Sequence, residues 1–439
     1  MQKLSLLICC LSALFISQAQ DTVKTYWKNN QLMSQGIQKA GVEEGVWTYY
    51  HYNGTKWSQG EFKDGQRVGI WKSWFDDGKL NQEYNAVSGP FKSWYQNGQV
   101  ESVGQMADGK RTGKWTFYHP NGKLFKEVTY VRDSVNGPVT EYFDNGEKYF
   151  EGTYKMGELD GYACWWQKNG KKDMEGNTSN GLQQGIWSFY LENGEVGSTG
   201  NFEQGLQDGE WVYFYDNGVV WKKGNYESGK REGLWQAFYE NGKLQRKGSF
   251  KNNMEEGLWI SYYQNGKVQD QGTFHQAVME GTWTGWYNNG WQKYVMNYKA
   301  GKLNGAYTYY WEETGKMSRK GTYKDNLKNG SWEEYAQNGR ILNKGKYVMD
   351  KKEGMWSFYN AHEKKIREQN FVDDVQCGKF IEYYDNGAKH FQGSFKDRRR
   401  DGKWSCWKPD GTLYYSVLFS NGQKVKELYV KDPSNGRPF

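Results

Sequence analysis

The stretch GLWQAFYENGKLQRKGSF, residues 233–250, decides the fold because it contains a complete two-stranded unit. At its centre is Asn241-Gly242, with alternating apolar and polar residues on both sides. Asn-Gly in that setting is the strongest short signal for a β-hairpin with a two-residue type I′ turn, which requires positive φ at both positions. Such a turn places Glu240 opposite Lys243 and fixes the pairing of the two strands.

Counting outward from that turn pairs Trp235 with Gly248 and Gly233 with Phe250. A glycine allows the aromatic residue across the strand to lie flat over the backbone, so a glycine-rich chain can still form a sheet. Side chains alternate between the two faces of a strand, so these four residues share one face, which we call the core face. The opposite face carries Phe238, and we call it the stripe face.

The unit recurs through nearly the whole chain with a spacing of 24 residues, except for 20 after Gly69 and 25 after Gly305. A fixed period of this size indicates a repeat architecture in which each unit buries its surface against its neighbours. The sequence therefore predicts an all-β fold: an elongated solenoid or meander of about sixteen 24-residue β-hairpin repeats that form one twisted antiparallel sheet. The sixteen units begin at Gly45, Gly69, Gly89, Gly113, Gly137, Gly161, Gly185, Gly209, Gly233, Gly257, Gly281, Gly305, Gly330, Gly354, Gly378 and Gly402.

Every unit also carries an aromatic residue at the position of Phe238 on the stripe face. Rings at a fixed repeat position usually stack on their neighbours along a solenoid. They can also form a binding ladder, since exposed aromatic side chains are common anchors of interfaces. These candidate binding residues, which we call the aromatic stripe, are Tyr50, Trp74, Trp94, Tyr118, Tyr142, Trp166, Tyr190, Phe214, Phe238, Tyr262, Trp286, Tyr310, Tyr335, Tyr359, Tyr383 and Trp407.

The two ends of the chain differ from the repeats. Residues 1–19 have a positive start, an apolar stretch and a small-residue cleavage site, so we expect a signal peptide and an exported protein, periplasmic, outer-membrane-associated or secreted. Residues 20–44 are predicted to form an N-terminal half-repeat and cap, residues 45–425 the sixteen repeats, and residues 426–439 a C-terminal cap and tail. The apolar stretch of the signal is too short to span a bilayer, and no transmembrane segment is expected after its removal.

The charge distribution argues against a nucleic-acid partner. The formal net charge is +7, from 58 basic and 51 acidic residues scattered along the whole length. A nucleic-acid binder would concentrate its basic residues on one stripe. The densest basic run, residues 398–400, lies between Asp397 and Asp401 and is predicted to be a solvated turn.

No group of residues has the spacing of a catalytic or metal site. The five histidines mostly occupy different repeat positions, and carboxylates such as Asp144 and Glu240, which precede Asn-Gly, suit solvation of a turn better than calcium binding. The cysteines after the signal, Cys164, Cys377 and Cys406, form neither a disulfide framework nor a zinc pattern. We therefore expect no enzyme activity, no cofactor and no metal, and cysteines buried for structural reasons.

Residues 224–235, GNYESGKREGLW, resemble the MORN repeat, whose signature is glycine, aromatic, glycine, glycine at this spacing. Trp235 stands where the common MORN unit has another glycine, and a Tyr-x-Asn-Gly turn is added. These departures are similar to the bacterial MORN-variant repeats of YwqK-type "antitoxin" proteins. The resemblance covers about residues 26–422. It implies β-hairpins stacked into an elongated twisted sheet that serves as a scaffold for protein partners and in some cases touches membrane lipids.

The leading functional hypothesis is a non-enzymatic exported scaffold that mediates protein–protein interaction at a bacterial cell envelope. The alternative is a glycan- or cell-wall-binding solenoid that stacks sugars on the aromatic stripe, and a lipid surface is a third candidate partner. An antitoxin role implies a cytosolic partner, which conflicts with the signal peptide, so it is not carried over.

Three irregular units are further places to look for function. Repeat two lacks four residues around positions 84–88, repeat twelve has an enlarged turn at 312–315, and repeat fourteen has Ala361-His362-Glu363 in place of Asn-Gly. Loops tolerate insertions and deletions, so each irregularity also has an explanation without function.

Overall fold

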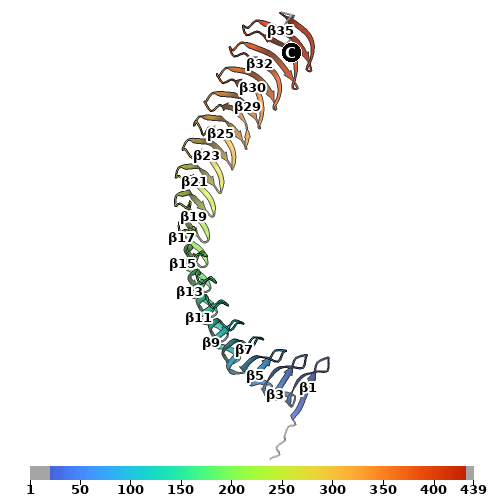
Figure 1. Ribbon diagram of the computed structural model, residues 1–439, viewed down its shortest axis with the longest axis vertical. Helices are drawn as coiled ribbons and strands as arrows, with labels where there is room; N and C mark the ends of the chain where they lie inside the picture. Colours follow the sequence, from blue (N-terminus) through green and yellow to red (C-terminus); the bar gives the residue numbers. More distant parts are fainter. Residues whose placement is uncertain (1–19, 432–439) are drawn as a thin grey trace, which may run out of the picture. The chain divides into compact units, whose positions relative to one another are not determined.

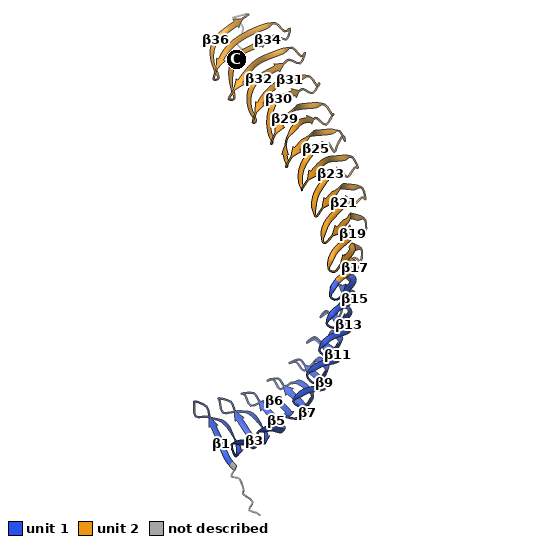
Figure 2. Ribbon diagram, turned by 180° about the vertical axis from the view of Figure 1, so that it is seen from behind, with its two compact units in different colours: residues 1–206 blue, residues 207–439 orange. Residues whose placement is uncertain are grey.

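The computed structural model describes residues 20–431 and divides the chain into two compact units, residues 1–206 and 207–439 (Figure 2). Within the described range every regular element is a strand, so the predicted all-β class is confirmed. Consequently this range offers no helix with the length and apolar character needed to cross a bilayer. The predicted signal peptide at 1–19 and the end of the tail at 432–439 lie outside the described residues.

The strands follow the repeat period closely. Those of the first unit are β1 (Gln20–Tyr26), β2 (Leu32–Lys39), β3 (Val42–Tyr50), β4 (Lys56–Lys63), β5 (Gln66–Trp74), β6 (Leu80–Asn85), β7 (Ser88–Trp94), β8 (Val100–Ala107), β9 (Lys110–Tyr118), β10 (Leu124–Val131), β11 (Ser134–Tyr142), β12 (Lys148–Lys155), β13 (Glu158–Trp166), β14 (Lys172–Ser179), β15 (Leu182–Tyr190) and β16 (Val196–Glu203). The second unit carries β17 (Leu206–Phe214), β18 (Val220–Glu227), β19 (Lys230–Phe238), β20 (Leu244–Lys251), β21 (Met254–Tyr262), β22 (Val268–His275), β23 (Val278–Trp286), β24 (Gln292–Lys299), β25 (Lys302–Tyr310), β26 (Met317–Lys324), β27 (Leu327–Lys328), β28 (Gly330–Tyr335), β29 (Ile341–Val348), β30 (Lys351–Tyr359), β31 (Lys365–Val372), β32 (Val375–Tyr383), β33 (Lys389–Lys396), β34 (Arg399–Trp407), β35 (Leu413–Ser420) and β36 (Gln423–Val430).

Within each unit the strands form an antiparallel meander. Successive strands pair from β1 to β16 and from β17 onward, as the ribbons in Figure 1 show. The short β27 replaces the start of β28, and both pair with β26. The predicted hairpin meander is therefore confirmed within each unit.

The Asn-Gly turns differ from the predicted type I′ turns. Gly242 has a φ of 77°, whereas Asn241 has no positive φ. The Gly242 N–H donates to the Tyr239 carbonyl at 2.8 Å, and the Tyr239 N–H donates to the Lys243 carbonyl at 2.8 Å. These bonds close a three-residue loop, residues 240–242, in which only glycine occupies the left-handed position.

The predicted strand pairing nevertheless holds, because a second irregularity compensates for the longer loop. Phe238 pairs with Leu244, and Gln245 is then skipped as a bulge residue. Beyond the bulge Trp235 pairs with Gly248, as the sequence predicts. Two different turn geometries therefore lead to the same interior register.

Two-residue turns of the type I′ kind lie at the opposite ends of the strands. Between β18 and β19 the turn residues Ser228 and Gly229 have φ values of 48° and 79°. The following strand then contains two extra residues, 233 and 234, so that Gly224 comes to pair with Trp235. Trp235 is therefore flanked by a glycine on both neighbouring strands.

The ring lies over the glycine of the preceding strand, which is not the partner that the hairpin arithmetic suggested. A Cβ atom on Gly224 would lie 2.3 Å from the Trp235 ring, and one on Gly248 would lie 2.1 Å from Trp259. The Trp235 Nε1–H also donates to the Asn225 carbonyl at 3.0 Å. The core face of this part is thus a file of tryptophans, each covering the backbone eleven residues earlier.

Aromatic residues between the tryptophans complete the core face. Phe250 meets Trp235 edge to face at a centroid distance of 6.0 Å and Trp259 at 5.1 Å, and all three are buried. Such pairs contribute about 0.5–1.5 kcal/mol each beyond burial of their area. The core is therefore one layer of rings on one face of the sheet.

Candidate interaction surfaces

The aromatic stripe lies on the stripe face, and all sixteen of its rings are half-buried. None is fully buried and none is fully exposed, so their burial is compatible with packing between repeats and with binding of a partner. The surroundings of the rings show what covers them.

Lysine side chains cover several stripe rings. Lys56 Nζ lies 5.6 Å from the Trp74 ring centroid, Lys148 lies 4.9 Å from Trp166, and Lys389 lies 5.8 Å from Trp407; each lysine is eighteen residues before its ring. These are cation–π distances. The stripe face thus combines rings with mobile cationic side chains, a mixture that suits an interface more than a dry core.

Tyrosine or histidine side chains that begin many of the Asn-Gly turns form a ladder that sequence reasoning missed. The Tyr239 hydroxyl donates to the backbone carbonyl of Tyr262 at 2.7 Å, and the Tyr263 hydroxyl donates to that of Trp286 at 2.8 Å. His119 replaces the tyrosine in its unit and donates through Nε2 to the Tyr142 carbonyl at 2.9 Å. The Tyr in Tyr-x-Asn-Gly was the visible signal, and its role is to tie each turn to the next stripe strand.

One carboxylate on the stripe face collects several donors. Glu175 accepts from Lys172 at 2.6 Å and from the hydroxyls of Tyr162 and Tyr190. Burial alone would raise its pKa, but the hydrogen bonds from Lys172 and the two tyrosines outweigh burial and lower the pKa to about 2. Burial, together with the bond to Glu175, raises the pKa of Tyr190 to about 12. This cluster fixes a stripe ring in place.

A second row of apolar side chains runs beside the stripe. It occupies the position directly after the repeat glycine, which strand alternation places on the stripe face. In the second unit Leu234 is 53% exposed and Leu258 is 55% exposed, each four residues before the half-buried stripe ring of its strand, Phe238 or Tyr262. Adjacent repeats therefore present exposed aliphatic side chains and half-buried rings on the same face of the sheet.

The structure explains two of the irregular units as local turn variants. In repeat twelve the Gly315 N–H bonds the Trp311 carbonyl at 2.9 Å, so the extra residue lies in the predicted enlarged turn. In repeat fourteen Glu363 has a φ of 60° and takes the place of the turn glycine. Neither turn gathers groups that suggest a ligand.

The remaining candidate groups also have structural roles. Between residues 20 and 431, no three His, Cys, Asp or Glu side chains gather as a metal site requires. Cys164 and Cys406 are buried free thiols, and burial raises the pKa of Cys406 to about 11. The solvated turn predicted at residues 398–400 is wrong for Arg399 and Arg400, because the tight turn comprises Asp397 and Arg398, β34 begins at Arg399, and Arg400 lies 4.9 Å from the Trp404 ring on the core face.

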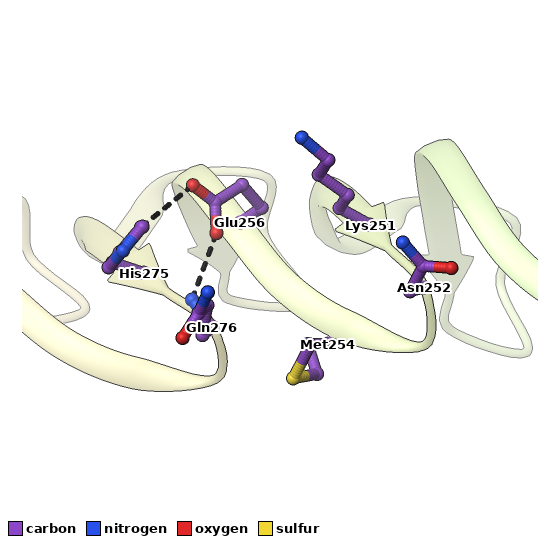
Figure 3. Close-up of a pocket in the computed structure, with 6 residues that line it drawn as sticks. All are labelled: Lys251, Asn252, Met254, Glu256, His275 and Gln276. Atoms are coloured by element: carbon purple, nitrogen blue, oxygen red, sulfur yellow. Dashed lines mark hydrogen bonds and ion pairs between the residues drawn. The ribbon is translucent and has the colours of Figure 1, made fainter.

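A small hollow of about 140 Å³ lies along the tight-turn edge of the second unit (Figure 3). Its Glu256 accepts the Gln276 N–H at 2.9 Å and His275 Nδ1–H at 3.0 Å, and these bonds, the backbone one first, lower the pKa of the carboxyl. Glu232 makes the same bond to the Asn252 N–H at 2.8 Å one repeat earlier. The hollow is therefore part of a repeated carboxylate ladder that fixes the tight turns.

Together these features define a class: tandem β-hairpins of about 24 residues that share one ring-covered core face. The sequence model described as "MORN repeat variant" matches ten stretches of the chain, residues 43–64, 67–86, 88–108, 111–132, 135–156, 207–228, 231–252, 255–276, 279–300 and 376–397. The chain belongs to the MORN-variant repeat proteins.

No curated protein matches the chain significantly. Solved structures that match the chain include a TcdB2-TccC3-Cdc42 complex (11% identity, 93% of this chain and 26% of that one, TM-score 0.15) and the Photorhabdus luminescens Tc holotoxin pore (11% identity, 92% of this chain and 26% of that one, TM-score 0.15). The chain thus spans about a quarter of those chains. At this level of superposition the likeness supports no argument about function.

Proposed function

We propose that this MORN-variant repeat protein is a non-enzymatic scaffold that binds a protein partner through its stripe face. The observation that supports it most is the row of exposed aliphatic side chains, Leu234 and Leu258 among them, on the face that also carries the half-buried stripe rings. Exposed apolar surface rimmed by charge is typical of protein–protein interfaces. Aliphatic groups on this face offer no hydrogen bonds to a sugar, so the surface suits a protein better than a glycan ladder.

The test is a pull-down from bacterial envelope extract with the full chain as bait. Leu234→Glu combined with Leu258→Glu should remove the captured partner, because two carboxylates would be desolvated in the interface. Ser331→Glu alters the same repeat position in a unit without an aliphatic residue there and should leave capture unchanged. Equal capture by all three proteins contradicts the proposal.

Two other partners remain distinguishable outcomes. Retention of a polysaccharide that is abolished by Trp74→Ala and Trp94→Ala would transfer the function to the glycan ladder. Attachment to anionic vesicles that weakens steeply with salt would indicate a lipid surface.

We also infer that the protein is exported to the cell envelope. The support is the composition of residues 1–19. Fractionation of bacteria that express the chain with and without these residues tests this, and an equal cytosolic distribution of both forms contradicts it. Turnover in a hydrolase panel would contradict the non-enzymatic assignment.

A further inference from the structure

A row of paired residues crosses the core face of the first unit beside the tryptophan file. In most of the unit this row is filled by large or ion-paired side chains, such as Phe150, Trp165 and the Lys126–Glu141 pair at 2.6 Å. Between Tyr49 and Phe117 it consists only of small or polar side chains. Each pairs directly with the next one across β4 to β8: Ser58, Ser73, Gln82, Ser93 and Ser102, the polar row.

Small side chains in a row flanked by rings leave space on the core face. Two hollows of about 450 and 390 Å³ lie over the polar row, and Gln82 lines both. Their volumes fall in the range of ligand sites. No comparable filling group projects over Ser58 or Ser73, so the space is a direct consequence of the sequence at these positions.

The shortened second repeat shapes this region. β6 and β7 pair without the two extra residues that other repeats insert before the tryptophan. Tyr84 and Phe91 therefore pair directly, where other repeats place a glycine and a tryptophan. Because four residues are missing, this repeat has two rings, Tyr84 and Phe91, where other repeats have a glycine covered by a tryptophan. The two rings line the hollows.

The walls of the first hollow are aromatic. Tyr49, Tyr84 and Trp57 line it, and the Trp57 side chain is 51% exposed. Trp57 contacts Tyr49 edge to face at 6.2 Å and lies 6.3 Å from the His51 ring, so its half-exposed ring has a defined orientation. A half-exposed, oriented indole beside a polar floor is a platform for stacking.

The floor offers unused hydrogen-bonding groups. Within residues 20–431, the side chains of Ser58, Ser73 and Gln82 make no hydrogen bond, although all three are half-buried. By contrast, the hydroxyls of Ser93 and Ser102 bond each other at 2.7 Å. Half-buried polar groups without partners are available to a ligand.

The charges of the two hollows favour a neutral ligand. Arg111 in the second hollow is paired with Asp133 at 3.0 Å, and Glu101 lines the same hollow. Arg67 in the first hollow donates to the Tyr84 hydroxyl at 3.3 Å and lies 4.2 Å from the Trp71 ring. Arg67 gives the first hollow one formal positive charge, and Glu101 beside the Arg111–Asp133 pair gives the second hollow one formal negative charge, so no single anion or cation matches both hollows.

We propose that the polar row is the floor of a binding site for a neutral oligosaccharide, with one sugar ring in each hollow and the Gln82 amide between them. Sugars combine flat C–H faces, which stack on aromatic rings, with many hydroxyls, which bond serine and amide groups. An extended peptide would seek unpaired backbone groups at a sheet edge. The polar row lies inside the sheet, where the backbone is already paired. This inference concerns the face opposite the proposed partner surface and is independent of it.

The chain contains a matched control for Trp57. Trp221 occupies the same bulge position in the second unit, is 42% exposed, and contacts Tyr213 edge to face at 6.5 Å. The residue after it is Lys222, in place of Ser58, and Lys222 Nζ lies 4.3 Å from the Trp221 ring. The control therefore has the platform without the polar floor.

The experiment measures binding of neutral oligosaccharides to the full chain by a glycan array followed by calorimetry. Trp57→Ala should weaken binding of the best glycan at least about tenfold, and Ser73→Phe, which fills the floor, should abolish it. Trp221→Ala should leave the affinity unchanged. Circular dichroism and partner capture should be unaltered in all three variants.

Several outcomes overturn the proposal. They are no neutral glycan bound at millimolar concentration, binding that survives both Trp57→Ala and Ser73→Phe, and equal loss with Trp221→Ala. Saturable binding of a peptide that competes at Trp57 would also overturn it. If the stripe-face pull-down fails while glycan binding is lost with Trp57→Ala and Ser73→Phe and kept with Trp221→Ala, the scaffold proposal falls and the sugar site remains.

Discussion

Two repeats solve the same packing problem in opposite ways. In the second unit the indole of Trp259 covers Gly248, whose backbone is ordinary extended strand, and a Cβ there would lie 2.1 Å from the ring. In the first unit Val128 and Val139 occupy the corresponding positions, pair directly, and are each 1% exposed. The total volume across the pair is what stays similar, because a core tolerates exchanges that conserve volume and shape.

Two other pairs combine a larger side chain at the glycine position with a smaller ring, whereas the Gly152–Ala163 pair departs from the rule. Where Met296 replaces the glycine, Tyr307 replaces the tryptophan, and where Gln369 replaces the glycine, Phe380 follows. In the described repeats tryptophan occurs at the ring position only when the residue eleven before it is glycine. The glycine is thus required by the ring above it and not by its own backbone.

Breaking the pair directly gives the largest expected effect. Gly248→Val places two methyl groups where the Trp259 ring lies, so we expect about 3 kcal/mol of destabilisation of the surrounding repeats. Hydrogen exchange of β20 and β21 is the appropriate measurement, because repeat arrays unfold locally. Adding Trp259→Val should restore part of the loss, since that double variant copies the Val128–Val139 solution.

The control for that experiment lies in the first unit. Val128→Gly leaves bare backbone under Val139, which creates a small void without a clash and should cost about 1–2 kcal/mol. A Gly248→Val variant no less stable than this control would show that the ring position adapts freely. The volume rule would then be wrong.

Most of the fold could be predicted from the sequence, and the reasons for the exceptions are specific. The period, the hairpins, the pairing of Trp235 with Gly248 and the position of the stripe follow from spacing alone. The spacing does not show which glycine each ring covers, because Gly224 and Gly248 both flank Trp235. The choice between them depends on the two extra residues before Trp235. Asn-Gly is likewise compatible with two turn types. Because the observed longer loop is followed by a bulge at Gln245, its strand pairing is the same as that expected for a type I′ turn.

The proposed sugar site was beyond sequence reasoning for a related reason. Its floor joins residues from β4 to β8, so locating it requires the register of both kinds of turn and of the bulges between them. Sequence spacing did identify repeat two as irregular, but not which side chains its shortening brings together. The exposure of the stripe also required the structure, because alternation assigns a face and not the depth of a ring.

A pH titration sharpens the comparison between the two units. Glu175 in the first unit accepts from Lys172 and two tyrosines, whereas Glu368 in the second accepts from Lys365 and from Tyr383 alone. Both carboxyl pKa values are lowered, that of Glu175 to about 2. The contribution of Glu175 to folding stability is complete at pH values above the ordinary carboxyl pKa of 4.5 and is lost as the pH falls through about 2.

We expect Glu175 to contribute about 1–2 kcal/mol at neutral pH, less than the full shift implies, since solvent screens a partly exposed group. NMR titration of the two carboxyls should place Glu175 below Glu368. Glu175→Gln should remove the acid-dependent part of the first unit's stability between pH 4.5 and 2. A variant with an unchanged acid profile would show that the cluster is not coupled to folding.

The turn ladder gives a smaller effect. Tyr239→Phe deletes the hydroxyl that donates to the Tyr262 carbonyl at 2.7 Å, and a neutral hydrogen bond of this kind contributes about 1 kcal/mol. In the first-unit repeat His119 makes the equivalent bond, so His119→Tyr should be nearly neutral while His119→Phe should resemble Tyr239→Phe. Exchange rates of the amides in β11 and β21 would report both. Equal effects of Tyr and Phe at position 119 would contradict the ladder.

The smallest effect separates the two halves of the asparagine's role. Asn121 Oδ1 accepts the Lys123 N–H at 3.0 Å, and Asn121 Nδ2 donates to the Asp144 carbonyl of the next repeat at 2.8 Å. Asn241 makes only the bond within its own turn, in which its Oδ1 accepts the Lys243 N–H at 3.0 Å. An aspartate keeps the acceptor and lacks the donor, as Asp77 and Asp410 already do in their turns. Asn121→Asp should therefore destabilise the following repeat by about 0.5 kcal/mol more than Asn241→Asp does, because a single exposed hydrogen bond contributes at the lower end of the usual range. Amide exchange in the following repeat measures both substitutions. If the two substitutions cost the same, the asparagine acts only within its own loop, and the links between turns rest on the aromatic ladder alone.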